Sequence, residues 1–182
     1  ILTVVLGVGY PLLITGVGQL ALPSQANGSL VRSDGAVVGS ALIGQSFTDA
    51  DGTALPEWFQ SRPSAAGAGY DGGASSGSNY GPENPDLISA IQDRKSAIES
   101  LDSVTASEIP ADALTASGSG LDPHISPAYA LLQVPRVAEA RGIPEAQVRA
   151  LVEAFIQGRD LGYLGEPTVN VLQLNIALAK LG

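Results

Sequence analysis

The chain has 182 residues, 45% of them hydrophobic and 15% charged, which suits a folded protein with its own core. Its 18 acidic and 9 basic side chains give a formal net charge of −9, which argues against binding to a nucleic-acid backbone. It contains no cysteine, so disulfides, zinc–thiolate sites, iron–sulfur clusters and cysteine nucleophiles are excluded.

The first 22 residues, ILTVVLGVGYPLLITGVGQLAL, carry no charge, and the first charged side chain is Arg32. As a helix this stretch would span about 33 Å, enough for a hydrocarbon core of ~30 Å. We therefore expect residues 1–23 to form a transmembrane helix that Pro11 kinks. Small residues and this proline are candidate positions for packing against another helix: Gly7, Gly9, Pro11, Gly16 and Gly18.

A cleaved signal peptide is the alternative for this segment, because Ser24-Gln25-Ala26 resembles a cleavage site. The apolar stretch is longer than the roughly 7–15 residues of a signal core, which favours the membrane anchor. No Lys or Arg follows closely, and this favours an exported C-terminal side. We expect a single-pass protein of the inner or plasma membrane, with residues 24–182 outside the cytoplasm.

A β-hairpin is predicted next, because Asp34-Gly35 lies between two β-branched runs. Residues 48–85 are loop-rich, but their aromatic side chains indicate packing rather than disorder: Trp58, Phe59, Tyr70 and Tyr80. A loop of this length is usually functional or forms an interaction surface.

Residues 84–182 are predicted to be mainly helical. The first helix has Asn84 as its cap and Pro85 at its first position, and a second begins at Ser126-Pro127. The remaining signals are a kink or split at Pro135, an end at Gly142, a third helix from Pro144 to Gly158, and a last helix capped by Asn170. The expected fold class is α+β, with one N-terminal transmembrane helix followed by a single extracytoplasmic domain of several helices and a small antiparallel sheet.

Motifs for catalysis are present only in part. GAGYDG at 67–72 lacks the strand and helix that a dinucleotide site requires, and GASSG at 73–77 lacks the buried strand of a nucleophile elbow. Lys95-Ser96 follows Arg94 rather than the glycine of a phosphate-binding loop, and no aspartyl-phosphate motif occurs. We therefore predict no catalytic residue.

The segment SGSGLDPHISP at 117–127 contains His124, the only histidine of the chain, two positions after Asp122. A catalytic metal usually needs three protein ligands, and the only other acidic residue within ten positions is Asp112, so no metal site is predicted. The segment is typical of a rigid corner or a partner contact. Its residues in that role are Ser117, Gly118, Gly120, Asp122, Pro123, His124, Ser126 and Pro127.

A family resemblance is carried by a series of segments in a fixed order. They are GSLV, VVGSALIGQSF, WFQSRPSAA, SSGSNYGPENP, SGSGLDPHISPAYALLQVPRVAEARG and LGYLGEPTVNVLQLNIALAKL. In this order they resemble the KdpC family, the C subunit of the Kdp potassium-transporting P-type ATPase complex. The resemblance covers nearly the whole chain.

The resemblance implies an accessory subunit without catalysis of its own, in a complex that couples ATP hydrolysis to potassium uptake. The implied partners are the channel-like, P-type ATPase and small single-span subunits, together with membrane lipid. Potassium is carried by the complex, and no cofactor belongs to this chain. We expect the outer domain to rest on the channel-like subunit near the potassium entrance, where its acidic surface would raise the local cation concentration.

The family is also described as a catalytic chaperone that raises the ATP affinity of the pump subunit. By resemblance, the nucleotide candidates would be Ser75, Ser76, Gly77, Ser78 and Asn79, with Ser76-Gly77-Ser78 in place of a more typical Ser-Gly-Gly-Ser run. Backbone amides can bind an anion. However, an exported domain faces a compartment without ATP, and Arg62 and Arg94 are the nearest cations in sequence. The sequence therefore leaves two roles open for this chain, a structural one and a nucleotide-binding one.

Overall fold

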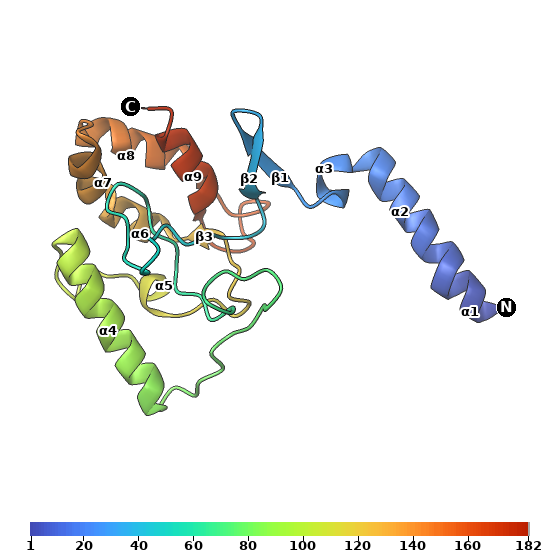
Figure 1. Ribbon diagram of the computed structural model, residues 1–182, viewed down its shortest axis with the longest axis horizontal. Coiled ribbons are helices and arrows are strands. Elements are labelled where there is room, and N and C mark those ends of the chain that lie inside the picture. Colours follow the sequence, from blue (N-terminus) through green and yellow to red (C-terminus); the bar gives the residue numbers. More distant parts are fainter. Residues whose placement is uncertain (182) are drawn as a thin grey trace. The chain divides into compact units, whose positions relative to one another are not determined.

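The computed structural model describes residues 1–181, which divide into two compact units, with the boundary in the chain after Leu42. In the first unit, α1 (Leu2–Val4), a π-helical turn η1 (Val5–Gly9) and α2 (Tyr10–Ala21) follow one another as a single helix (Figure 1). This 20-residue helix is long and apolar enough to cross a membrane, and none of its residues is buried, as the sequence predicted.

The wide turn η1 ends two positions before Pro11. Proline has no N–H for the carbonyl four positions earlier, so a local change in helical pitch is the expected response to it. Thr15 Oγ1 donates to the Pro11 carbonyl at 2.8 Å, which keeps this hydroxyl satisfied within the helix. A four-residue helix, α3 (Pro23–Ala26), follows and contains Ser24-Gln25-Ala26, the residues that resemble a cleavage site.

The predicted hairpin is confirmed. Strands β1 (Leu30–Ser33) and β2 (Ala36–Ser40) pair antiparallel, with Ser33 opposite Ala36. Asp34 and Gly35 both have positive φ, +49° and +83°, as in the two-residue turns that suit the twist of a hairpin.

In the described residues of the second unit, 43–181, six helices combine with a three-stranded antiparallel sheet in the order β3-β5-β4, which confirms the α+β class (Figure 1). Its helices are α4 (Pro85–Asp102), α5 (Ala111–Leu114), α6 (Pro127–Leu132), α7 (Val134–Arg141), α8 (Glu145–Ala154) and α9 (Val171–Leu178). Its strands are β3 (His124–Ile125), β4 (Ile156–Gln157) and β5 (Thr168–Asn170).

The three predicted caps are present. Asn84, Ser126 and Asn170 each accept a hydrogen bond from a backbone N–H in the first turn of α4, α6 and α9, at 2.8, 3.1 and 3.1 Å. The split at Pro135 is also confirmed, because α6 and α7 are separated at Gln133. The predicted end of the third helix at Gly158 is wrong. It ends at Ala154 because the next residues pair with β5 as a strand.

The core of the second unit lies between its helices and one face of the sheet. Buried aliphatic side chains from α7, α8, β5 and α9 form its centre: Val134, Val137, Val148, Val152, Val169, Leu174 and Leu178. The long loop before α4 contributes Phe59, which is fully buried, while Tyr80 in the same loop is exposed. The loop is therefore packed on the core in part, as its aromatic residues indicated.

Buried polar side chains hold this loop in place. Asn175 of α9 binds both backbone groups of Phe59, accepting from its N–H at 3.0 Å and donating to its carbonyl at 2.9 Å. Gln133 does the same for Gln60, at 2.6 and 3.2 Å. These side-chain amides supply the hydrogen bonds that buried backbone groups otherwise receive from a neighbouring strand.

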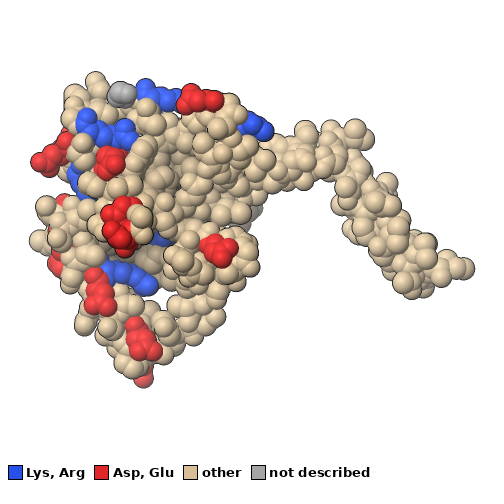
Figure 2. All heavy atoms as spheres, in the orientation of Figure 1, with Lys and Arg blue, Asp and Glu red and all other residues tan. Residues whose placement is uncertain are grey.

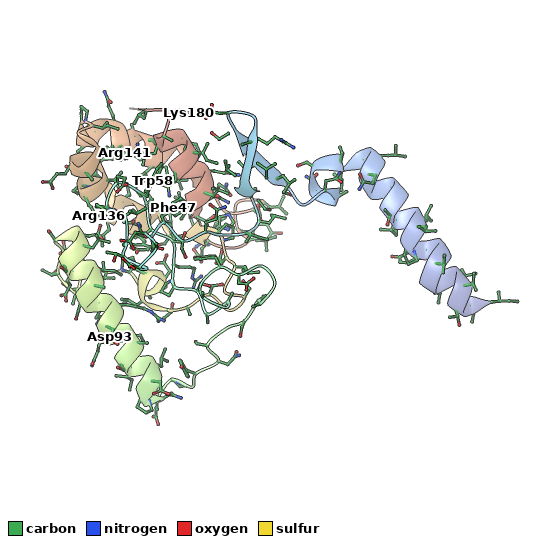
Figure 3. All side chains as sticks on the ribbon, in the orientation of Figure 1. Phe47, Trp58, Asp93, Arg136, Arg141 and Lys180 are labelled. Carbon is green, nitrogen blue, oxygen red and sulfur yellow. The ribbon has the colours of Figure 1, made fainter. Side chains whose placement is uncertain are left out.

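An arginine at the centre of this network joins α4 to α7. Arg136 Nε lies 2.7 Å from Asp102, and both side chains are almost fully buried. The same guanidinium donates to the carbonyls of Pro56 and Trp58. Beside it, Arg141 lies 4.3 Å from the ring centre of Trp58 (Figure 3). Burial raises the pKa of Asp102, and Arg136 offsets that effect only in part.

Charged side chains are absent from the apolar helix and occur with both signs on the face of the second unit shown in Figure 2. Arg149 and Glu145 form an exposed pair one turn apart on α8, at 2.8 Å. Pairs of this kind add little to stability. Packing and the buried polar network are thus the main determinants of the fold.

Candidate functional site

The two Ser- and Gly-rich segments identified in the sequence lie against each other. Ser119 supplies one carbonyl that accepts both the Ser76 N–H at 3.0 Å and the Ser75 hydroxyl at 2.9 Å. We call residues 75–77 and 117–120 together the Ser-Gly junction. It joins parts of the chain more than 40 positions apart, which no local motif predicted.

Glycine is required in the junction because the two backbones approach closely. A Cβ on Gly77 would lie 2.7 Å from the Gly118 carbonyl oxygen. A Cβ on Gly120 would lie 2.6 Å from the Ser76 carbonyl oxygen and 2.7 Å from the backbone nitrogen of Ala66, and Gly120 has φ of +70°. A Cβ on Gly118 would meet no atom within 4 Å.

The next residues form the Asp-Pro-His corner, held by Arg62 from the long loop. Arg62 Nη1 lies 3.0 Å from Asp122 Oδ2, while Asp122 Oδ1 accepts the His124 N–H at 3.0 Å and lies 3.3 Å from His124 Nδ1. Burial opposes ionisation of Asp122, but the hydrogen bonds from His124 and Arg62 outweigh it and hold the pKa below its usual value. Asp122 therefore stays a carboxylate at neutral pH.

Further contacts fix both ends of the corner. The Pro123 carbonyl accepts the Val171 N–H at 3.0 Å, and His124 pairs with Asn170 across β3 and β5. Asp112 accepts the Ser126 N–H at 2.7 Å and the Ser126 hydroxyl at 2.8 Å. Pro127, the residue after Ser126, is the first residue of α6.

Tyr70 braces the loop that carries Arg62. Its hydroxyl donates to the Arg62 carbonyl at 2.7 Å, and burial raises the pKa of Tyr70 to about 12. Ser64 donates to the Gly120 carbonyl at 2.6 Å, and Pro63 accepts the Ser117 N–H at 3.0 Å. Three segments thus lie together: the loop that carries Arg62, the Ser-Gly junction and the Asp-Pro-His corner. The pairings of Arg62 with Asp122 and of Asp112 with Ser126 were not predicted, because sequence spacing gives no contact between residues 60 or 14 positions apart.

Residues 75–79, the nucleotide candidates that the family resemblance offers as an alternative, are mostly exposed. The Ser76 N–H and the Ser75 hydroxyl, two donors that a phosphate would need, are already bonded to Ser119. The Asn79 amide donates to the Gly77 carbonyl at 3.1 Å, and Ser78 is exposed beside it. These bonds favour a closed turn over an open anion-binding nest.

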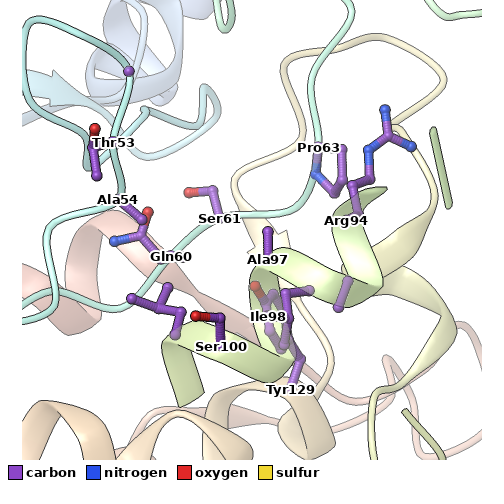
Figure 4. A pocket seen from close by; sticks show the side chains of 13 residues that line it. Thr53, Ala54, Gln60, Ser61, Pro63, Arg94, Ala97, Ile98, Ser100 and Tyr129 are labelled. Carbon is purple, nitrogen blue, oxygen red and sulfur yellow. The ribbon is translucent and has the colours of Figure 1, made fainter. Parts of the chain in front are cut away.

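The second unit has two larger hollows. One of about 500 Å³ lies at the Asp-Pro-His corner; its wall is mostly apolar, and its charged and polar lining residues include Arg62, Asp112, Asp122, His124 and Glu166. The other, of about 630 Å³, lies between α4 and the long loop and has mostly apolar walls (Figure 4). Among residues 1–181, no three His, Asp or Glu side chains converge where they could hold a metal ion.

The glycines of the apolar helix have open space beside them. A Cβ on Gly7 or Gly16 would meet no atom within 4 Å, and one on Gly9 would meet only the Val4 carbonyl oxygen at 3.9 Å. A Cβ on Gly18 would contact Ala26 of α3 at 3.8 Å. Gly9 and Gly16 lie about 20° apart on an ideal helix, so they share one face.

Comparison with known proteins identifies similar sequences over nearly the whole chain. Residues 1–180 match the family described as KdpC, the c chain of the K⁺-transporting ATPase. A protein of Caulobacter vibrioides named potassium-transporting ATPase KdpC subunit is 59% identical over 177 residues, which are 97% of this chain and 86% of that protein. Proteins of the same name from Kineococcus radiotolerans and Mycobacterium tuberculosis are 54% and 52% identical, over 95% and 100% of this chain and 85% and 93% of theirs.

Proposed function

The chain belongs to the KdpC family of potassium-transporting ATPase subunits, and on this premise we propose that it is a non-catalytic accessory subunit required for assembly and activity of the pump. Residues 1–23 span the cell membrane in this proposal. The remainder lies outside the cytoplasm and stabilises the complex on that side, near the potassium entrance of the channel-like subunit. The P-type ATPase and small single-span subunits are the other proposed partners.

The observation that carries the proposal is how the polar groups of the candidate site are used. Asp122 is bonded to Arg62 and His124, and the Ser119 carbonyl is bonded to two donors of residues 75–76. A catalytic or ligand-binding centre needs polar groups directed at a substrate. Groups bonded to one another instead support a rigid corner that holds a surface in shape for a neighbouring subunit.

A reporter fused to the C-terminus tests the proposed topology and with it the nucleotide alternative. Alkaline phosphatase is active after export and green fluorescent protein is active in the cytoplasm, so the two fusions give opposite signals. We expect phosphatase activity. A cytoplasmic C-terminus would contradict the proposal and favour the catalytic chaperone, with Ser75, Ser76, Gly77, Ser78 and Asn79 as the residues to test for ATP binding.

The helix face formed by Gly9 and Gly16 is proposed to pack against a helix of another subunit. Gly16→Leu would fill the close approach that a small residue permits. We expect it to reduce the amount of this chain that co-purifies with the other subunits from detergent. Val17→Leu is the matched control, because it places the same side chain about 100° around the helix. Equal retention of both variants would exclude this face as the contact.

A further inference from the structure

The loop between β4 and β5 exposes large apolar side chains at its tip. Leu161, Tyr163 and Leu164 are 82%, 69% and 49% exposed, and every residue from 157 to 166 is exposed. Single exposed leucines are normal on a protein surface, but here three large apolar residues are exposed within four positions and lie outside the core. We refer to residues 161–164 as the apolar tip.

The apolar tip is held by its own backbone. Asp160 and Leu164 exchange two hydrogen bonds, each at 2.9 Å, and the Tyr163 N–H donates to the Asp160 carbonyl at 3.2 Å. Arg159 and Glu166 form an ion pair across its base. The exposed side chains are therefore presented by a closed turn rather than by a loose strand.

Leu161 is an unfavourable choice for this turn. Leu161 and Gly162 both have positive φ, +52° and +84°. These values are close to those of Asp34 and Gly35 in the turn of the β1–β2 hairpin, +49° and +83°. Asn, Asp or Gly is preferred at the first of these positions, and Asp34 obeys that rule. Leucine costs conformational energy there and also exposes an apolar side chain. A strained backbone conformation that brings no local stabilisation is typical of residues that contact a binding partner.

The charges around the tip indicate the kind of partner. Asp160 and Glu166 flank it, and Arg159 is paired with Glu166. Loops that insert into anionic membranes carry basic flanks, because acidic side chains are repelled by the headgroups. Because Arg159 and Glu166 neutralise each other, Asp160 leaves one net negative charge beside the tip, and this charge suits a protein recess with a basic rim. As a subunit of a transport complex, the chain has other protein surfaces beside it.

We propose that the apolar tip docks into an apolar recess, rimmed by basic side chains, on another subunit of the potassium-transporting ATPase. Leu161 and Tyr163 fill the recess, while Asp160 faces its rim. The inference rests on the proposed accessory function and assigns the surface through which the second unit would contact the complex.

Leu161→Asn separates the role of the tip from a role in the fold. Asparagine suits a positive φ, so the unfolding temperature of the full chain in detergent is expected to stay equal or rise. The fraction of the variant retained with the other subunits on dilution is expected to fall at least tenfold. Ile88→Asn, which replaces an exposed apolar residue of α4, is the control and should be retained like the parent chain. Equal retention of Leu161→Asn and the parent would overturn the proposal.

A probe at Tyr163 distinguishes a protein recess from lipid. Because this 182-residue chain has no cysteine, Tyr163→Cys accepts a polarity-sensitive fluorophore at a single site. We expect the label to report water in phosphatidylcholine–phosphatidylglycerol vesicles that hold this chain alone, and an apolar environment only in the assembled complex. An apolar signal in the vesicles alone would overturn the proposal in favour of a lipid surface, and a water signal in both would overturn it outright. Failure of the unlabelled parent to assemble would instead refute the accessory function itself.

Discussion

Gly120→Ala is the sharpest test of the Ser-Gly junction. The substitution adds one methyl group at a position whose φ is +70°, and this group would lie 2.6 Å from the Ser76 carbonyl oxygen and 2.7 Å from the Ala66 backbone. Those neighbours are backbone atoms and a short side chain, which cannot rotate away. The two bonded segments would have to separate.

The expected loss of stability has two contributions. A left-handed conformation costs an alanine roughly 1–2 kcal/mol, and forcing a methylene-sized group into a packed site costs about 1–3 kcal/mol. Together they give about 2–5 kcal/mol of unfolding free energy. At about 2–4 °C per kcal/mol for a chain of this size, the unfolding temperature should fall by on the order of 10 °C.

Gly118→Ala is the matched control, because its Cβ would enter open space. We expect a change within about 0.5 kcal/mol for this variant. Thermal unfolding of both full-length variants in the same detergent, followed by circular dichroism, measures the difference. Equal unfolding temperatures for Gly118→Ala and Gly120→Ala would refute the close approach of the two segments.

Three further changes probe the corner and the buried network. Asn175→Ala removes both hydrogen bonds to the Phe59 backbone and should cost about 2–5 kcal/mol in denaturant unfolding. Arg136→Met leaves Asp102 buried without its cation and should cost about 3–5 kcal/mol. Because the pKa of Asp122 is lowered in the fold, its contribution is complete above the usual carboxyl pKa of ~4 and is lost as pH falls below it, so Asp122→Asn should flatten the pH dependence of stability in that acid range.

These three predictions have distinct contradicting outcomes. Gln147→Ala, at an exposed position of α8, is the control for the buried amide and should leave stability nearly unchanged. Stability of Asn175→Ala equal to that of this control would mean that the loop is held by other contacts. An Arg136→Met chain as stable as the parent would show that the buried pair contributes no net stability. An unchanged acid profile in Asp122→Asn would assign the titration to another carboxyl.

Local signals in the sequence were sufficient for the elements that begin with a strong cap or turn. Asn84, Ser126 and Asn170 each satisfy a nearby N–H, and Asp34-Gly35 sets its own hairpin, so these features depend on neighbours within a few positions. The end of α8 was misplaced because Gly158 suggested a stop, whereas pairing with β5 decides it. Tertiary contacts override local preference at such ends.

The candidate site could be located but not assembled from the sequence. The glycines and the Asp-Pro-His motif marked residues 117–127 as special, yet Arg62 lies 60 positions away from Asp122, its partner. Spacing gives no information about such a pair. The apolar tip was not predicted from the sequence, because exposure of a leucine is a property of the folded molecule.

The attachment of the long loop to α9 sets the order in which the chain can fold. Phe59 is bonded to Asn175, 116 positions later, so its backbone groups gain these partners only after Asn175 has been made. Contacts of such separation form slowly, because a long loop must close before they stabilise the chain. Docking of α9 is therefore the step that attaches the loop, and a chain cut short before Asn175 lacks the side chain that holds it.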